Sequence, residues 1–107
     1  MNRTELEQNF CRKTIRGYLE EGYYAQAGAT IEILIAKNPK EARRIFLAEC
    51  YAVMRAMFDG SKNPRQALNL ISGVARHIPE EWNDDLKARY AQHMVDDLKI
   101  VDNREGN

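Results

Sequence analysis

Residues 40–59 read KEARRIFLAECYAVMRAMFD, and they predict a helix that is apolar on almost every side. The residues before this stretch favour a helix start. Asn38 can accept a hydrogen bond from the first free amides, and Pro39 suits the first helical position. Gly60 follows the stretch and can adopt the left-handed conformation that ends a helix. We therefore expect this helix to be the central element of the fold.

A helix that is apolar nearly all round must be covered by neighbours on several sides. The chain before and after residues 40–59 should therefore pack onto this helix. The main gap in its apolar coat holds three charged residues that share one side at helical spacing, Glu41, Arg44 and Arg55. The residues that we expect to be among the least exposed are Ile45, Tyr51 and Met54.

The composition is typical of one soluble, helix-rich domain spanning residues 1–107. Sixteen basic and sixteen acidic side chains cancel, which argues against generic binding to polyanions but leaves room for a local basic patch. No apolar run approaches the roughly 20 residues that span a bilayer, and the polar residues 2–5 do not predict a signal peptide. Two cysteines without such a signal indicate free thiols in a reducing compartment, so we expect a cytoplasmic protein.

Four further helices are expected around the central one, at about residues 4–20, 23–37, 64–77 and 79–101. Thr4 and Glu7 form a capping-box pattern, and Asn63 before Pro64 repeats the cap-then-proline signal. The polar tail from Asp102 to Asn107 is expected to fray. Because the connections are short, helices that follow one another should be antiparallel neighbours.

Apolar stripes at helical spacing mark the buried side of these helices. Gly28 lies within the stripe of the second helix, where the missing side chain would let another helix come close. The stripe of the first helix comprises Leu6, Phe10, Cys11, Ile15, Tyr18 and Leu19. The stripe of the last helix comprises Trp82, Leu86, Tyr90, Met94, Leu98 and Val101.

The chain also resembles itself at a shift of 40 residues, which pairs the range 24–41 with the range 64–81. Each copy is a helix, a proline-started turn and the next helix. The pattern resembles that of tetratricopeptide-type repeats, and the matching residues are Tyr18, Ala27, Ile31 and Pro39, then Phe58, Ala67, Ile71 and Pro79. This resemblance covers about residues 11–81 and implies stacked helical hairpins. The sequence departs from the family in its period, which is about 34 residues there, and in the positions where the family has Trp and Gly, which here are Cys11, Tyr51, Ile15 and Arg55.

The sequence holds few candidates for catalysis or metal binding. None of Cys11, Cys50, His77 and His93 forms the close pairs that are typical of zinc sites, so we expect no metal and no cofactor. His93 and Asp97 are four residues apart and could form an oriented base, but an ion pair within one helix explains that spacing more simply. Glycine-rich phosphate loops and activated-serine motifs are absent from the sequence.

Arginines gather on the outer side of the first helix and on the charged side of the central helix. If these helices pack side by side, their basic residues could form one surface that suits carboxylates or phosphates. Acids are interspersed among them, so a solvated charged face is the alternative interpretation. We predict a partner-binding surface made of Asn9, Arg12, Arg16, Arg44 and Arg55.

Together these patterns predict an all-α fold, a five-helix bundle of stacked antiparallel hairpins similar to tetratricopeptide repeats. The predicted function is non-enzymatic: a small adaptor, chaperone or inhibitor that binds another protein, of the kind that phages or mobile elements use to block a host complex. A homodimer is compatible with the excess apolar surface of the central helix. The alternative is a nucleic-acid-binding helical protein that uses the arginine-rich face.

Overall fold

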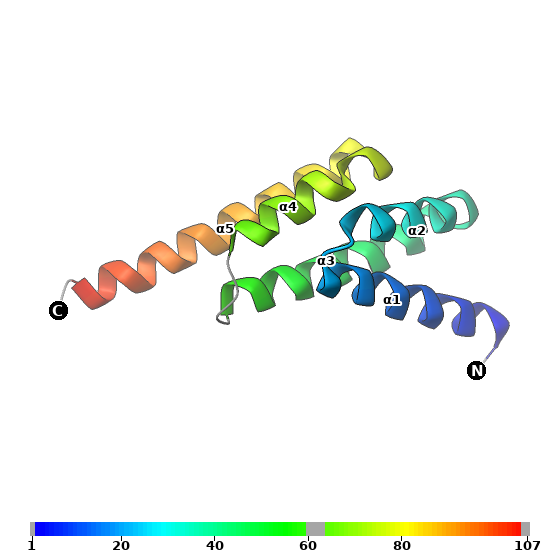
Figure 1. The fold of residues 1–107 in the computed structure, drawn as a ribbon, viewed down its shortest axis with the longest axis horizontal. Coiled ribbons are helices and arrows are strands. Elements are labelled where there is room, and N and C mark those ends of the chain that lie inside the picture. The colour runs from blue at the N-terminus through cyan, green and yellow to red at the C-terminus, as the bar shows by residue number, and fades with distance from the viewer. Residues whose placement is uncertain (1, 60–63, 106–107) are drawn as a thin grey trace.

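Five α-helices and one short 3₁₀ turn make up the computed structural model (Figure 1). It describes the backbone of residues 2–59 and 64–105, and their side chains except those of residue 4 and residues 97–105. The predicted all-α fold is confirmed, since the described residues contain no strand. The elements are α1 (Arg3–Glu21), α2 (Tyr24–Lys37), α3 (Pro39–Asp59), α4 (Arg65–Val74), η1 (Ala75–His77) and α5 (Glu80–Glu105).

Side-chain caps and a glycine set the helix ends near the N-terminus. The expected cap at Thr4 is wrong, because Asn2 has extended backbone and its Oδ1 accepts a hydrogen bond from the Glu5 amide at 2.8 Å, so that α1 begins at Arg3. The amide of Gly22 donates to Leu19 at 3.3 Å, and its φ of 85° is a conformation that other residues rarely adopt. The predicted cap of α3 is confirmed, since Asn38 Oδ1 accepts from the Glu41 amide at 3.2 Å.

Of the other predicted helix ends, two lie outside the described residues and two lie at other residues in the structure. Gly60 and Asn63, which we expected to end α3 and to cap α4, lie outside the described residues. The helix that we expected to run to about His77 ends at Val74 and continues as the 3₁₀ turn η1. Helix α5, expected to end at about Val101, extends to Glu105, while the expected fraying of the tail from Asp102 stays a prediction. No Gly or Pro interrupts the sequence between Pro79 and Gly106, so each added residue can continue the backbone hydrogen-bond ladder.

Consecutive helices run in opposite directions, and α3 packs between α1 and α5 while α2 covers another of its sides (Figure 1). The helix α4 contacts α2 and α5 more extensively than it contacts α3. The C-terminal half of α5 continues beyond the other helices, which makes the molecule elongated, with extents of 55 × 29 × 22 Å. Its radius of gyration of 15.2 Å exceeds the value of about 13 Å expected for a spherical domain of this length.

The core is centred on α3, which confirms it as the central element. Ile45 and Met54 are fully buried, as predicted. The prediction for Tyr51 is wrong, because its ring is only half-buried at the junction with α5, where the guanidinium of Arg89 covers it. Helix α3 buries nine side chains along its length, Ala42, Ile45, Phe46, Leu47, Glu49, Cys50, Val53, Met54 and Met57.

Two glycines allow α2 to approach α4 and η1 closely. A Cβ atom at Gly28 would lie 2.7 Å from Cδ2 of His77, which confirms the expectation that this glycine permits close packing. A Cβ atom at Gly73 of α4 would lie 2.5 Å from Cβ of Tyr24. Real Cβ contacts are never this short, so a side chain at either position would push the helices apart.

This close packing predicts that Gly73→Ala lowers the free energy of unfolding by about 1–2 kcal/mol, because overpacking outweighs the gain in helix propensity. The matched control is Gly17→Ala in α1, where a Cβ atom would meet nothing within 4 Å. That variant should gain about 0.5–1 kcal/mol. Urea denaturation followed by circular dichroism measures both, and equal gains for the two variants would contradict the close contact of α2 and α4.

Candidate functional site

A buried carboxylate joins α1 to α3. Glu49 of α3 is only 5% exposed, and its Oε2 accepts a hydrogen bond from Nε of Arg16, while Nε of Arg12 lies 4.0 Å from its Oε1. Arg16 also lies 4.0 Å from Glu20, one turn along α1. A charged group taken out of water is costly unless it is paired. Arg12 and Arg16 therefore compensate the burial of Glu49 and hold the two helices in register.

Another arginine that was predicted to bind a partner, Arg44, lies near the start of α3. The guanidinium of Arg44 donates to Glu41 through Nη2 at 2.7 Å and through Nε at 3.2 Å, across one helical turn. These hydrogen bonds lower the pKa of Glu41, and the charges of Arg44, Arg12 and Lys40 lower it further. Because Arg12 influences Glu41, the first turns of α3 and the middle of α1 form one electrostatic neighbourhood.

A groove of about 620 Å³ runs along the junction of α3 and α5. Arg55 lies in it and pairs with Asp59 at 3.3 Å. Aromatic rings from both helices form part of its wall, since Phe58 stacks on the His93 ring at 4.8 Å between centroids and Arg89 lies 4.4 Å from the centre of the Tyr51 ring. The groove thus combines aromatic surface with charges of both signs.

The five residues predicted to bind a partner therefore lie in two neighbouring regions. Arg12 and Arg16 lie at the junction of α1 and α3, Arg44 lies on α3 beside Glu41, and Asn9 lies half-buried one turn before Arg12. Arg55 lies eleven residues after Arg44, about 16 Å further along α3, and lines the groove toward α5. The surface they outline runs across α1 and α3 and reaches the groove beside α5.

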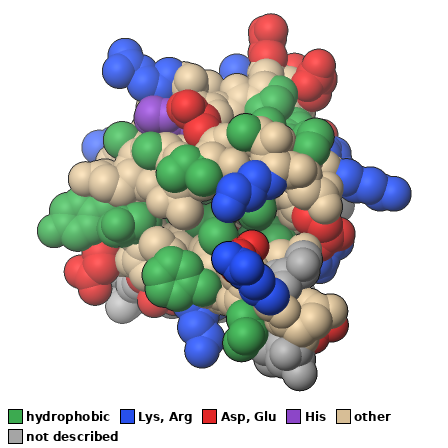
Figure 2. Space-filling view, turned by 90° about the vertical axis from the view of Figure 1, so that its right-hand side faces the viewer, with side chains coloured by type: hydrophobic (Ala, Val, Ile, Leu, Met, Phe, Trp, Pro, Cys, Tyr) green, Lys and Arg blue, Asp and Glu red, His purple; other side chains and the backbone are tan. Residues whose placement is uncertain are grey.

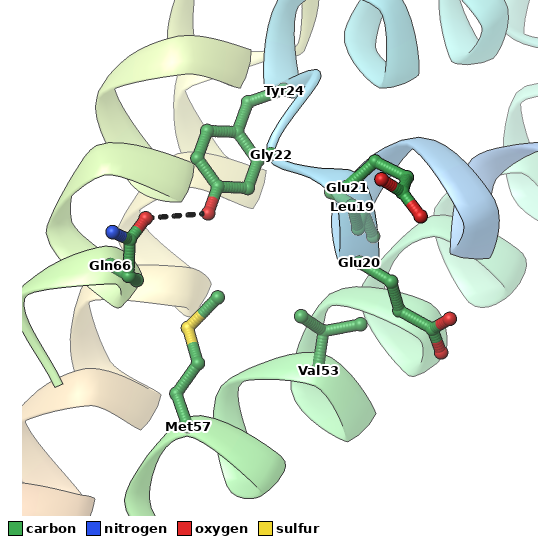
Figure 3. Close-up of a pocket in the computed structure, with 8 residues that line it drawn as sticks. All are labelled: Leu19, Glu20, Glu21, Gly22, Tyr24, Val53, Met57 and Gln66. Atoms are coloured by element: carbon green, nitrogen blue, oxygen red, sulfur yellow. Dashed lines mark hydrogen bonds between the residues drawn. The ribbon is translucent and has the colours of Figure 1, made fainter. Parts of the chain in front are cut away.

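A second hollow, of about 370 Å³, lies where the end of α1 and the start of α2 meet α3 and α4 (Figure 3). The hydroxyl of Tyr24 donates to Oε1 of Gln66 at 3.2 Å on one side of it, and the carboxylates of Glu20 and Glu21 turn away from this pair. Val53 and Met57 of α3 also line it. Its polar groups do not converge on one point, so the hollow reflects the incomplete contact between α3 and α4.

The residues considered for metal or acid–base chemistry are dispersed. Burial raises the pKa of the Cys50 thiol, which keeps it protonated and unreactive, while Cys11 is half-buried on α1. His77 pairs with Glu32 of α2, whereas His93 stacks on Phe58. In the ranges 2–59 and 64–105, no three His, Cys, Asp or Glu side chains with described positions gather as a metal site would require. The side chain of Asp97, the proposed partner of His93, lies outside the described residues.

Comparison with family models, with curated proteins and with solved structures finds no match to the chain. The resemblance to tetratricopeptide repeats therefore stays a prediction. The part of the chain that the structure describes has no helix that is both long and apolar enough to cross a bilayer.

The sequence interpretation missed Glu49 and Arg89. Glu49 is the one acid inside the apolar run of α3, and a lone charge between apolar neighbours is a usable signal for a buried ion pair. Its partners come from a different helix and could not be read from spacing along α3. Arg89 gave no comparable signal, because its contact with Tyr51 depends on how α5 crosses α3.

The burial of Glu49 predicts that Arg16→Ala lowers the free energy of unfolding by about 2–3 kcal/mol, because the carboxylate is left without its closest donor. The double variant Arg16→Met, Glu49→Leu should recover most of this loss, since both charges are removed together. Chemical denaturation of the three proteins measures the effect.

The control for this series is Arg44→Ala, which breaks an exposed pair on α3 and should change stability by less than about 0.5 kcal/mol. If Arg16→Ala were as mild as this control, Glu49 would have enough solvent to remain charged without a partner.

Proposed function

We propose that this chain is a non-enzymatic protein-binding module whose working surface runs across α1, α3 and α5. The observation that supports it is the state of Arg44 and Arg55, whose guanidinium groups are largely exposed and, among the side chains that the structure describes, pair with acids one turn away on the same helix. Arg12 and Arg16 flank them and keep N–H groups beyond those that bind Glu49, because a guanidinium has five. Asn9 adds an amide beside them.

Exposed pairs within one helix contribute little to stability, about 0.3–0.5 kcal/mol each. A partner that offers carboxylates can therefore draw Arg44 away from Glu41, or Arg55 away from Asp59, at small cost to the fold. A guanidinium donates in a planar fork that matches a carboxylate, which is why arginine is favoured over lysine at protein interfaces.

The aromatic wall of the α3–α5 groove supplies the apolar part of such an interface. Tyr51, Phe58 and Tyr90 are only partly buried, and Arg55 lies in the groove that Tyr51 and Phe58 line. Interfaces obtain most of their binding energy from a few aromatic and arginine side chains in a desolvated centre. The groove provides both types of residue within one region of α3.

Nucleic-acid binding is the alternative function for the same arginines. The exposed guanidinium groups of Arg44 and Arg55 support this alternative. However, Glu41 and Asp59 lie directly against these groups, and Asp96 lines the groove. Acids in these positions would repel a phosphate backbone. A protein partner with carboxylates next to polar donors can satisfy both signs of charge, and so the protein-binding proposal ranks first.

We place the interaction in the cytoplasm, where the two free thiols would persist in reduced form. The proposal covers an adaptor, a chaperone or an inhibitor, including the small inhibitors by which phages and mobile elements block host complexes.

The test of this function is the double variant Arg44→Glu, Arg55→Glu, used as bait in an extract of the cells that make the protein. We expect the unmodified chain to retain a partner after nuclease treatment, and the variant to lose at least about tenfold in affinity, because like charges then face the partner's carboxylates. The matched control is Arg76→Glu, Lys87→Glu, which makes the same change in charge at exposed residues outside the surface. Circular dichroism confirms that each variant is folded.

Two results would reject this function. Equal losses in both variants would show that the partner responds to net charge alone. A captured partner that disappears with nuclease, together with a strongly salt-dependent shift of labelled DNA or RNA, would select the nucleic-acid alternative.

A further inference from the structure

The first helix leaves part of its apolar stripe uncovered. Phe10 is 72% exposed and Leu6 is 56% exposed, although both belong to the stripe that was expected to face the core. Ile33 of α2, at 65% exposed, lies beside them. We call these three residues the end patch. Figure 2 views the end of the molecule where α1 begins and α2 ends, and it shows apolar side chains at the surface between charges of both signs.

The end patch surrounds a groove of about 410 Å³ between α1 and α2. Cys11 and Leu34 form part of its wall, and its two charged residues are Glu7 from α1 and Lys37 from α2. Large exposed apolar side chains that adjoin an apolar groove mark interaction surfaces, since patches of about 300–600 Å² are the largest on typical monomers and are often functional.

The end patch contains both halves of an apolar contact and charges of both signs. The patch carries both a protruding ring, that of Phe10, and a groove that can receive such a ring. It also carries one acid and one base on opposite helices. In a two-fold interface, residue i of one copy meets residue j of the other and the reverse contact repeats it. A rotation about the centre of the patch can therefore place each Phe10 in the opposite groove and each Glu7 beside the opposite Lys37.

We propose that the end patch is the interface of a two-fold homodimer. Phe10 of each copy packs between α1 and α2 of its partner, and two Glu7–Lys37 pairs flank the apolar centre. An interface built on three exposed apolar side chains and one groove belongs to the small class, below about 1,200 Å², which is usually weak, so the dimer dissociates in the micromolar range. Arg12 and Arg16 lie on the side of α1 that faces α3, and the dimer leaves them accessible.

Sedimentation of the purified chain from about 1 μM to 1 mM tests the interface. The expected mass rises from 12.4 kDa toward twice that value. Phe10→Asp should shift the dissociation constant at least about a hundredfold and leave a folded monomer, because the ring is not part of the core. The matched control is Leu68→Asp, which places the same charge at an exposed leucine of α4 and should leave the dimer unchanged.

Exchanging the charges of Glu7 and Lys37 tests whether a second copy of the chain occupies the groove. Glu7→Lys and Lys37→Glu should each weaken the dimer, and the protein that carries both changes should regain it, since the pairs are then formed with reversed sign. Cys11 lines the groove and gives a second readout, because its alkylation should slow as the concentration rises, and should not slow in Phe10→Asp.

A mass that stays at 12.4 kDa up to 1 mM would overturn the proposal. A dimer that survives Phe10→Asp, or that the double charge exchange does not restore, would equally reject this interface. These measurements use the purified chain alone, so they are independent of the partner-binding test on Arg44 and Arg55.

Discussion

The burial of α3 is the constraint on which the rest of the structure depends. A helix with apolar side chains on most of its circumference gains stability only when several neighbours exclude water from it. Helices α1, α2 and α5 each cover one of its sides, and α4 completes the bundle by packing on α2 and α5. Helix α2 approaches η1 closely at Gly28 and α4 closely at Gly73, and the hollow lined by Met57 marks where α3 and α4 do not fully meet.

The sequence predicted the elements of this arrangement better than their contacts. The five helices, the Asn38 cap and the close packing at Gly28 followed from local chemistry, which acts over a few residues. Periodicity shows which side of a helix is apolar, but it does not show whether a neighbour reaches that side. Phe10 and Tyr51 were therefore expected in the interior, yet Phe10 lies exposed beside the groove between α1 and α2, and Tyr51 lies at the edge of the α3–α5 junction.

The same limit applies to the candidate site. Spacing along one helix correctly placed Arg44 near Glu41, since residues three apart lie on the same side. It could not show that Arg16 pairs with Glu49, because these residues are 33 positions apart and meet only in the folded chain. The structure therefore divides the arginines by what they hold. Arg12 and Arg16 of α1 compensate a buried charge, whereas Arg44 and Arg55 of α3 pair with acids one turn away on their own helix.

The two proposed surfaces lie on different sides of α1, and this separation has a consequence for binding. Arg12 and Arg16 face α3, whereas Phe10 lines the groove toward α2, so dimerisation would leave the arginine surface of each copy free. A dimer would present two identical surfaces, and an oligomeric partner with matching spacing would gain avidity from the second contact. Because a micromolar dimer forms only at sufficient concentration, such avidity would depend steeply on the amount of protein present. Weak self-association can in this way make a small helical module sensitive to its own concentration.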